Sequence, residues 1–222
     1  MVKEKNKTSE KLKHLLVNLE NGWNSLNKKS EAELFKFCEE YRQFLSKVKT
    51  EREVTRECVD LAEAAEFINL ETIINSRKKL SPGDKLYWNV GDKTLILIQI
   101  GTTDITSGIN IVGGHTDSPR LDLKPRPIYE DSELALLDTH YYGGIKKYQW
   151  VTMPLALHGT VVQKNGKSID ISIGEKESDP VFTITDVLPH LGKDQAEKKL
   201  SEAITGEGLN VLAGSIPLSR QM

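Results

Sequence analysis

The stretch INIVGGHTDSP, residues 109–119, carries the most information about the fold of this chain. It opens with an apolar run from Ile109 to Gly114, which predicts a short strand that ends directly at His115. In open α/β sheets, ligand sites collect where strands end. In a fold of that kind, the stretch places a candidate site at its His-x-Asp motif, formed by His115 and Asp117.

Two interpretations of this motif follow from the residues alone. A metal-binding imidazole works best when a carboxylate holds its second nitrogen, because the carboxylate fixes the tautomer and raises the basicity of the ligand. Asp117 stands two residues after His115 and can fill that role. The alternative is a histidine at a strand end and an aspartate that caps the following turn. The three-residue pattern by itself leaves both open.

Helices are predicted before this stretch, and strands follow them. Ser30 and Glu33 match a capping box, and the apolar residues after them recur at helical spacing, which predicts a helix with one buried face. Helices followed by near-continuous apolar strands indicate an α/β layer with a largely buried sheet. The predicted elements are helices from Ser30 to Val48 and from Val54 to Ala65, then strands at 86–90 and 94–100 joined by a Gly91-Asp92 turn.

The second half of the chain has the pattern of a mainly β structure. Alternating stretches at 155–162 and 169–173 flank Asn165-Gly166, a strong hairpin signal. Residues 193–204 predict one helix with a polar face. Because the pattern changes near Pro125, we divide the chain there.

The predicted domains are the α/β part, residues 1–125, and a β-rich part, residues 126–222. Their combined composition, 38% hydrophobic and 28% charged residues, is ordinary for a soluble globular protein. Thirty basic and 32 acidic side chains give a net charge of −2, which provides no field to attract nucleic acid or an anionic membrane. The apolar run Leu95 to Ile98 is far shorter than the roughly 20 residues of a membrane helix, and the N-terminus lacks a signal-peptide pattern. We therefore expect a cytoplasmic protein without nucleic-acid or membrane partners.

The cysteines and three of the other histidines show no metal-site spacing. Cys38 and Cys58 fall on the apolar faces of predicted helices, which indicates buried free thiols. His14 and His158 have no carboxylate at ligand spacing nearby, which indicates a surface or core role. His140 lies in a polar and aromatic loop and stays unassigned.

Two further sets of polar residues have an ordinary structural interpretation. His190, in LPHL at 188–191, stands between a predicted strand and a predicted helix, where a polar junction residue is expected. Glu175 and Glu177 follow a hairpin and predict solvated charges, as do the acidic residues of 130–133. No phosphate-binding loop, nucleophile elbow or Cys-x-x-Cys pair occurs in the chain.

Several motifs, taken together and in order, resemble the aspartyl aminopeptidase and vacuolar aminopeptidase I family, and its bacterial branch most closely. The resemblance runs along nearly the whole chain. It implies the N-terminal part of a zinc-peptidase α/β sandwich domain into which a β-rich dimerisation domain is inserted. The motifs are KTERE at 49–53, GHTDSPRL at 114–121, YGG at 142–144, PLAL at 154–157 and LPHL at 188–191.

The resemblance also implies a function and a site. Members remove N-terminal residues, often acidic ones, from peptides with two metal ions, usually zinc, although cobalt or manganese can serve. His115 would bind one metal, Asp117 would orient that histidine, and His190 would reach the substrate in a neighbouring subunit. Self-association as dimers, and as a dodecamer with enclosed active sites, is implied as well.

The chain departs from the family pattern in two respects. Many eukaryotic members have Gly-Gly-Gly and Trp-Phe-Asp-Arg where this chain has 143–145, GGI, and 150–153, WVTM, so a preference for acidic residues is left open. The family's bridging Asp, Glu pair, further Asp and last His lie downstream of the inserted domain, and no residue here matches them. We therefore expect an incomplete portion that is inactive alone.

Two alternatives to an enzyme portion follow. A truncated product that keeps the dimerisation surface would act as a non-catalytic assembly partner. A binding module with a structural zinc would need a second ligand, and none stands near His115 in the sequence.

Overall fold

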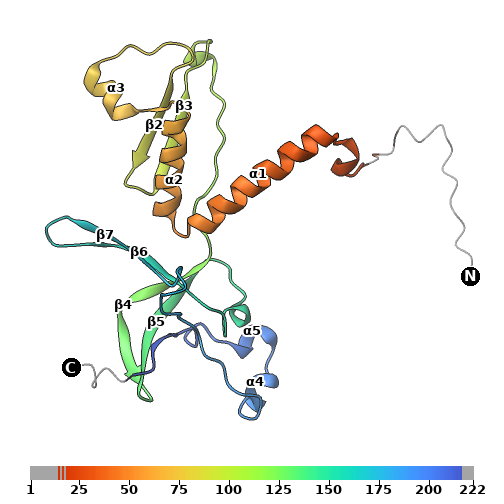
Figure 1. Cartoon of the computed structure of the whole chain (residues 1–222), viewed down its shortest axis with the longest axis vertical. Helices are drawn as coiled ribbons and strands as arrows, with labels where there is room; N and C mark the ends of the chain where they lie inside the picture. Colours follow the sequence, from red (N-terminus) through yellow and green to blue (C-terminus); the bar gives the residue numbers. More distant parts are fainter. Residues whose placement is uncertain (1–14, 16, 18, 217–222) are drawn as a thin grey trace, which may run out of the picture. The chain divides into compact units, whose positions relative to one another are not determined.

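The structure is a computed structural model that describes residues 15, 17 and 19–216 (Figure 1). It divides into two compact units, Met1–Lys47 and Val48–Met222. Helices and small sheets both occur, which confirms the predicted mixed α/β class. His14, for which a surface or core role was expected, lies outside the described residues.

The first unit contains the 3-10 helix η2, Gly22–Ser25, and the helix α1, Lys28–Lys47. The side chain of Asn27 caps α1, because its Oδ1 accepts hydrogen bonds from the amides of Lys29 and Ser30, both at 3.0 Å. Ser30 therefore lies inside the helix. The predicted capping box at Ser30 was wrong.

The predicted burial of one face of this helix was also wrong. No residue of α1 is buried, and Phe37, Tyr41 and Leu45 on the expected face are 66%, 55% and 50% exposed. Cys38, expected to be buried there, is exposed as well. Helical spacing identifies which face is apolar, but it contains no information on what covers that face.

In the second unit, a capping box starts helix α2, Glu51–Ala64. Thr50 accepts a hydrogen bond from the amide of Glu53, and the Glu53 carboxylate accepts one from the amide of Thr50. Cys58 on this helix is half-buried, short of the full burial that was predicted. Helix α2 packs on strands β2 and β3.

These strands belong to a three-stranded sheet with the order β1-β2-β3. Strand β1 is parallel to β2, and β2 is antiparallel to β3. Gly91 and Asp92 connect β2 and β3 with φ values of 62° and 56°, the positive angles that a tight hairpin turn requires. The elements are β1 Ile68–Asn69, helix α3 Leu70–Ser76, β2 Lys85–Val90 and β3 Thr94–Gln99.

The sheet is less buried than its apolar sequence predicted. Leu86 and Tyr87 in β2 are buried, but Ile96 and Leu97 in β3 are 40% and 52% exposed. In the described part of the chain, α2 is the helix that packs on β3. An apolar strand is buried on both faces only when both faces are covered.

The predicted strand at 109–114 does not form. After the 3-10 helix η3, Ile105–Ser107, residues 108–119 run as an irregular segment, and Ile111 and Val112 are 80% and 100% exposed. An apolar run predicts a strand only if a neighbour supplies the ladder of hydrogen bonds. Within the described residues, no strand supplies it.

Residues 120–214 form the β-rich part. Strand β5 lies between β4 and β8, and β6 pairs with β7 as the predicted hairpin around Gly166, which has a φ of 83°. Pro125 and Pro127 fall where the pairing of β4 and β5 shifts register, because proline donates no ladder hydrogen bond. The strands are β4 Arg120–Asp131, β5 Leu134–Tyr142, β6 Leu157–Val162, β7 Ser168–Ile173 and β8 Val211–Gly214.

A small apolar core holds this part together. Its buried members are Leu137, Ile184, Leu209 and Val211, and partly buried residues including Trp150 and Phe182 pack around them. The buried hydroxyl of Thr139 donates a 2.6 Å hydrogen bond to the carbonyl of Leu209, so β5 is tied to the segment before β8.

Two boundaries differ from the predicted ones. Residues 193–204 form two short helices, α4 Lys193–Ala196 and α5 Leu200–Ala203, and not one helix, because Lys199 between them is extended with a ψ of 146°. The predicted domain border at residue 125 lies inside the continuous strand β4. The two-domain division itself stays a prediction.

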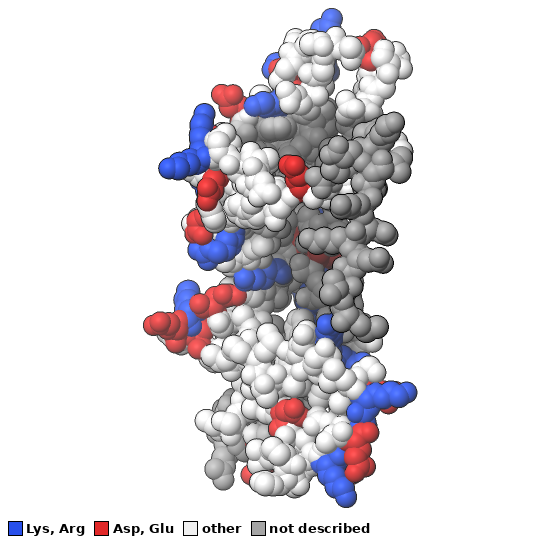
Figure 2. Space-filling model, turned by 90° about the vertical axis from the view of Figure 1, so that its right-hand side faces the viewer, with Lys and Arg blue, Asp and Glu red and all other residues white. Residues whose placement is uncertain are grey.

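Charges of both signs are mixed on the face shown in Figure 2. Figure 2 shows Lys and Arg side chains interspersed with Asp and Glu side chains over the visible face, in keeping with the net charge of −2. Among residues 15, 17 and 19–216, no helix has the length and apolar character to cross a membrane.

Candidate metal site

His115 and Asp117, predicted to act together, are in contact. The Nδ1 atom of His115 lies 3.1 Å from Oδ1 of Asp117 and 3.0 Å from the backbone carbonyl oxygen of the same residue. A carbonyl oxygen and an ionised carboxylate only accept hydrogen bonds, so Nδ1 is the donor. In a neutral imidazole this leaves the lone pair on Nε2.

The position of His115 leaves that second nitrogen accessible. The His115 side chain is 84% exposed, in the irregular segment between η3 and β4, while Asp117 is 35% exposed. An imidazole with one nitrogen held by a carboxylate and the other open is the arrangement of an oriented zinc ligand. The residues therefore fit the predicted roles of ligand and positioning carboxylate, which remain predictions.

Tyr142, at the end of β5, supports Asp117 from the other side. Its hydroxyl donates a 3.1 Å hydrogen bond to Oδ2 of Asp117. This bond, with a smaller contribution from His115, holds the pKa of Asp117 below its ordinary value, so the carboxylate is ionised at neutral pH. The contact joins two residues that are 25 positions apart, and no local spacing in the sequence indicates it.

The described residues provide one candidate metal ligand and not a complete site. Within residues 15, 17 and 19–216, no group of three His, Cys, Asp or Glu side chains is arranged to hold a metal ion. Zinc in proteins almost always has four ligands, of which at least three come from the protein. A zinc ion bound at His115 therefore needs ligands from elsewhere.

His190 is not part of this group. It lies in the turn Pro189–Leu191 before α4 and is exposed. None of the contacts of the described residues joins it to His115 or Asp117. Its predicted role in a neighbouring subunit is untested by the arrangement of a single chain.

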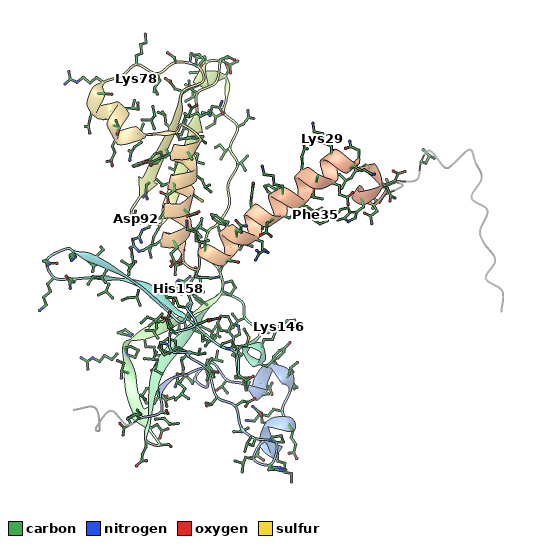
Figure 3. All side chains as sticks on the ribbon, viewed as in Figure 1. Lys29, Phe35, Lys78, Asp92, Lys146 and His158 are labelled. Carbon is green, nitrogen blue, oxygen red and sulfur yellow. The ribbon has the colours of Figure 1, made fainter. Side chains whose placement is uncertain are left out.

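His158 has carboxylate partners that its sequence neighbourhood did not reveal. Figure 3 labels it on β6, where its side chain is 10% exposed. Nδ1 lies 2.8 Å from Oε1 of Glu53 in α2, and Nε2 lies 2.9 Å from Oε1 of Glu175 after β7. Glu175 is exposed, as predicted for a solvated charge, but it also pairs with His158. We call these three residues the His158 cluster.

The His158 cluster joins α2 to the β6–β7 hairpin. Burial alone raises the pKa of Glu53, but hydrogen bonds from His158 and from the amides of Lys49 and Thr50 outweigh it, so the pKa is lowered. Arg56 makes a second connection between these elements through a 2.6 Å ion pair with Asp170 on β7.

A cavity of about 290 Å³ lies beside the His158 cluster and not at His115. Its walls are mainly apolar, and they include Leu121, Trp150, Leu155 and Phe182. Because most of these side chains also pack around the core, we assign the cavity no chemical role.

A histidine oriented by a carboxylate is typical of the metal sites of zinc proteins. Comparison with known proteins gives the family. The chain matches the Peptidase M18 family, described as aminopeptidase I zinc metalloprotease, over residues 44–219, and it belongs to this family.

Individual relatives and solved structures also belong to the M18 family. The chain is 48% identical over 204 residues to the probable M18 family aminopeptidase 1 of Clostridium acetobutylicum. This alignment covers 92% of this chain and 44% of that protein. It superposes on the crystal structure of an M18-family aminopeptidase from Thermotoga maritima with a TM-score of 0.81 and 41% identity, over 92% of this chain and 43% of that one. The chain thus spans less than half the length of these relatives.

A more distant solved structure shares the fold alone. It is the mApe1 dodecamer of S. cerevisiae, with a TM-score of 0.59 and 19% identity, over 80% of this chain and 38% of that one. The family resemblance found in the sequence is therefore confirmed. The roles of individual residues are not tested by these matches.

Proposed function

We propose that this chain is a portion of a zinc-dependent aminopeptidase and supplies its first metal-binding histidine. The observation that carries the proposal is the geometry of His115, whose Nδ1 is held by Asp117 while the rest of the side chain is exposed. Membership of the M18 family supports the choice of zinc and of peptide hydrolysis.

The chain's own residues have defined tasks in this proposal. Asp117 accepts the Nδ1 proton of His115 and so presents Nε2 to a metal ion. The hydrogen bond from the Tyr142 hydroxyl lowers the pKa of Asp117, and this keeps the carboxylate ionised. Two bound zinc ions, the number implied by the family resemblance, would lower the pKa of a water molecule and polarise a scissile carbonyl.

Substrate and assembly belong to the same proposal. Peptides are the substrates. We assign no preferred N-terminal residue, because residues 143–145 and 150–153 depart from the pattern of many eukaryotic members. The β-rich part serves self-association as dimers and as a larger assembly. The dodecamer formed by the distant S. cerevisiae relative supports a dodecamer here. We also propose a cytoplasmic location, from the sequence alone.

A chimaera tests the proposal. This chain is joined to the part of the C. acetobutylicum relative that it does not cover, and hydrolysis of Leu- and Glu-terminated peptides is measured with zinc present. We expect activity, and we expect His115→Ala to lower it by orders of magnitude because a metal ligand is lost.

The matched control is His140→Gln, which removes another exposed histidine, on β5, that contacts neither His115 nor Asp117. It should keep the activity of the chimaera. A chimaera that assembles and binds zinc but is equally active with and without His115 would exclude the proposed role. An assembled chimaera without activity in any form would favour the non-catalytic alternative.

A further inference from the structure

We propose that Tyr142 is a positioning residue for the metal-binding histidine: it fixes the carboxylate of Asp117, and through it the orientation of His115. The inference rests on the proposed function for its purpose, but its evidence is the contacts of this chain. If it holds, a residue of strand β5 helps to orient the metal-binding histidine.

The first step concerns the freedom of the Asp117 carboxylate. The terminal torsion of an aspartate is broad, so the single contact from His115 to Oδ1 does not fix the plane of the carboxylate. The Tyr142 hydroxyl binds the other oxygen, Oδ2, at 3.1 Å. With one partner on each oxygen, the carboxylate is held in the plane that accepts the Nδ1 proton of His115.

The second step concerns the direction of this hydrogen bond. The bond to Asp117 raises the pKa of Tyr142, so the phenol keeps its proton near neutral pH. Tyr142 therefore donates to a carboxylate that only accepts, and the bond is charge-assisted. A phenylalanine at this position would keep the ring and lose the donor.

The third step concerns how Tyr142 itself is held. It pairs with Arg120 across the β4–β5 ladder, and the Arg120 guanidinium lies 4.2 Å from the centre of the tyrosine ring. The guanidinium is in turn fixed by Glu51 at 3.0 Å and Asp122 at 2.7 Å. A planar guanidinium with two carboxylate partners makes a rigid support for the ring.

The last step is the connection between distant segments. Arg120 links α2, through Glu51, and β4, through Asp122, to the ring that contacts Asp117. Gly143, directly after Tyr142, has a φ of 80°, a conformation that favours glycine where the chain turns back against Pro119. The loop with His115 is therefore oriented by the sheet that follows it.

The test measures the tautomer of His115 in this chain. Long-range ¹H–¹⁵N NMR correlations, at a pH where the imidazole is neutral, give the ratio of the Nδ1–H to the Nε2–H form. We expect Nδ1–H to dominate in the wild type. Tyr142→Phe should lower the ratio about two- to tenfold, the value of one net hydrogen bond, and Asp117→Asn should lower it further.

Tyr141→Phe is the matched control. Tyr141 is the preceding residue on β5, of similar exposure, and its ring lies beside His140 and not beside Asp117. Its ratio should equal that of the wild type. A second variant, Arg120→Lys, keeps the charge but loses the planar support, and it should also lower the ratio.

The outcomes separate clearly. A lower ratio in Tyr142→Phe and Arg120→Lys with an unchanged ratio in Tyr141→Phe supports the proposal. A wild-type ratio in both variants overturns it, as does an equal loss in Tyr141→Phe. Because the ratio is a property of this chain, it can respond to Tyr142 even if the chimaera has no peptidase activity, so failures of the two proposals are distinguishable.

Discussion

The His158 cluster gives a prediction whose size follows from the structure. Glu53 has two tasks, because one carboxylate oxygen accepts hydrogen bonds from the amides of Lys49 and Thr50 and the other binds His158. Glu53→Ala removes both. Loss of the capping interaction costs ~0.5–2 kcal/mol, and leaving the nearly buried imidazole short of a partner costs about 1–3 kcal/mol.

Together these effects predict a loss of ~1.5–5 kcal/mol in the free energy of unfolding. For a chain of this length, that corresponds to a fall in Tm of about 3–20 °C. Glu53→Gln should lose only part of it, because glutamine can complete a capping box but has no charge for His158.

Urea unfolding followed by far-UV circular dichroism measures the difference. Asp60→Ala is the control, since it removes an exposed carboxylate from the same helix, and it should stay within about 0.5 kcal/mol of the wild type. A Glu53→Ala variant as stable as Asp60→Ala would refute the reasoning.

The pH dependence has a defined sign. Because the pKa of Glu53 is lowered in the folded chain, its carboxylate stabilises the fold fully above its unfolded pKa of about 4.3. That stability is lost as the pH falls through the folded value. The difference between the wild type and Glu53→Gln should therefore stay constant from pH 7 down to about pH 4.3 and shrink below it, and a difference that persists unchanged at lower pH would contradict the assignment.

Three further predictions concern the site. Asp117→Asn in the chimaera should keep the ligand but lower zinc affinity or turnover ~10–100-fold, measured by competition with a chelator and by peptide hydrolysis. This chain alone should hydrolyse neither Leu- nor Glu-terminated peptides, because its described residues hold no three-ligand group, and turnover by a pure sample would disprove this. Inactive His190→Ala and His115→Ala chimaeras, mixed under conditions that exchange subunits, should regain part of the activity; a mixture that exchanges fully and stays inactive would remove His190 from a shared site.

Local signals predicted the elements that depend on short-range chemistry. The amphipathic pattern from Val54 to Ala65 predicted α2, the Gly91-Asp92 pair predicted a turn, and Asn165-Gly166 predicted the β6–β7 hairpin. In each case a few neighbouring residues restrict the backbone enough to determine the structure.

The incorrect predictions depend on partners that are distant in the sequence. The run 109–114 is apolar enough for a strand, but pairing requires a neighbour, and none of the described strands provides it. Residues 193–204 have helical spacing, yet the backbone is extended at Lys199. Short elements with few contacts of their own follow their surroundings more than their propensity.

The same distinction applies to the candidate site. His115 and Asp117 are two residues apart, so their contact was predictable from spacing. Tyr142 reaches Asp117 only because β4 and β5 pair in a register that places Arg120 opposite Tyr142. No periodicity within one segment contains that register. The partners of His158 were missed for the same reason.

The zinc content of the chimaera tests the central claim most directly. Inductively coupled plasma mass spectrometry of the purified, assembled protein should give about two zinc ions per chain with His115 intact, the number a two-metal site requires. His115→Ala should lose at least one of them, while His140→Gln should keep both. Equal zinc content in the His115→Ala and wild-type proteins would contradict the account, because His115 would then not be a metal ligand.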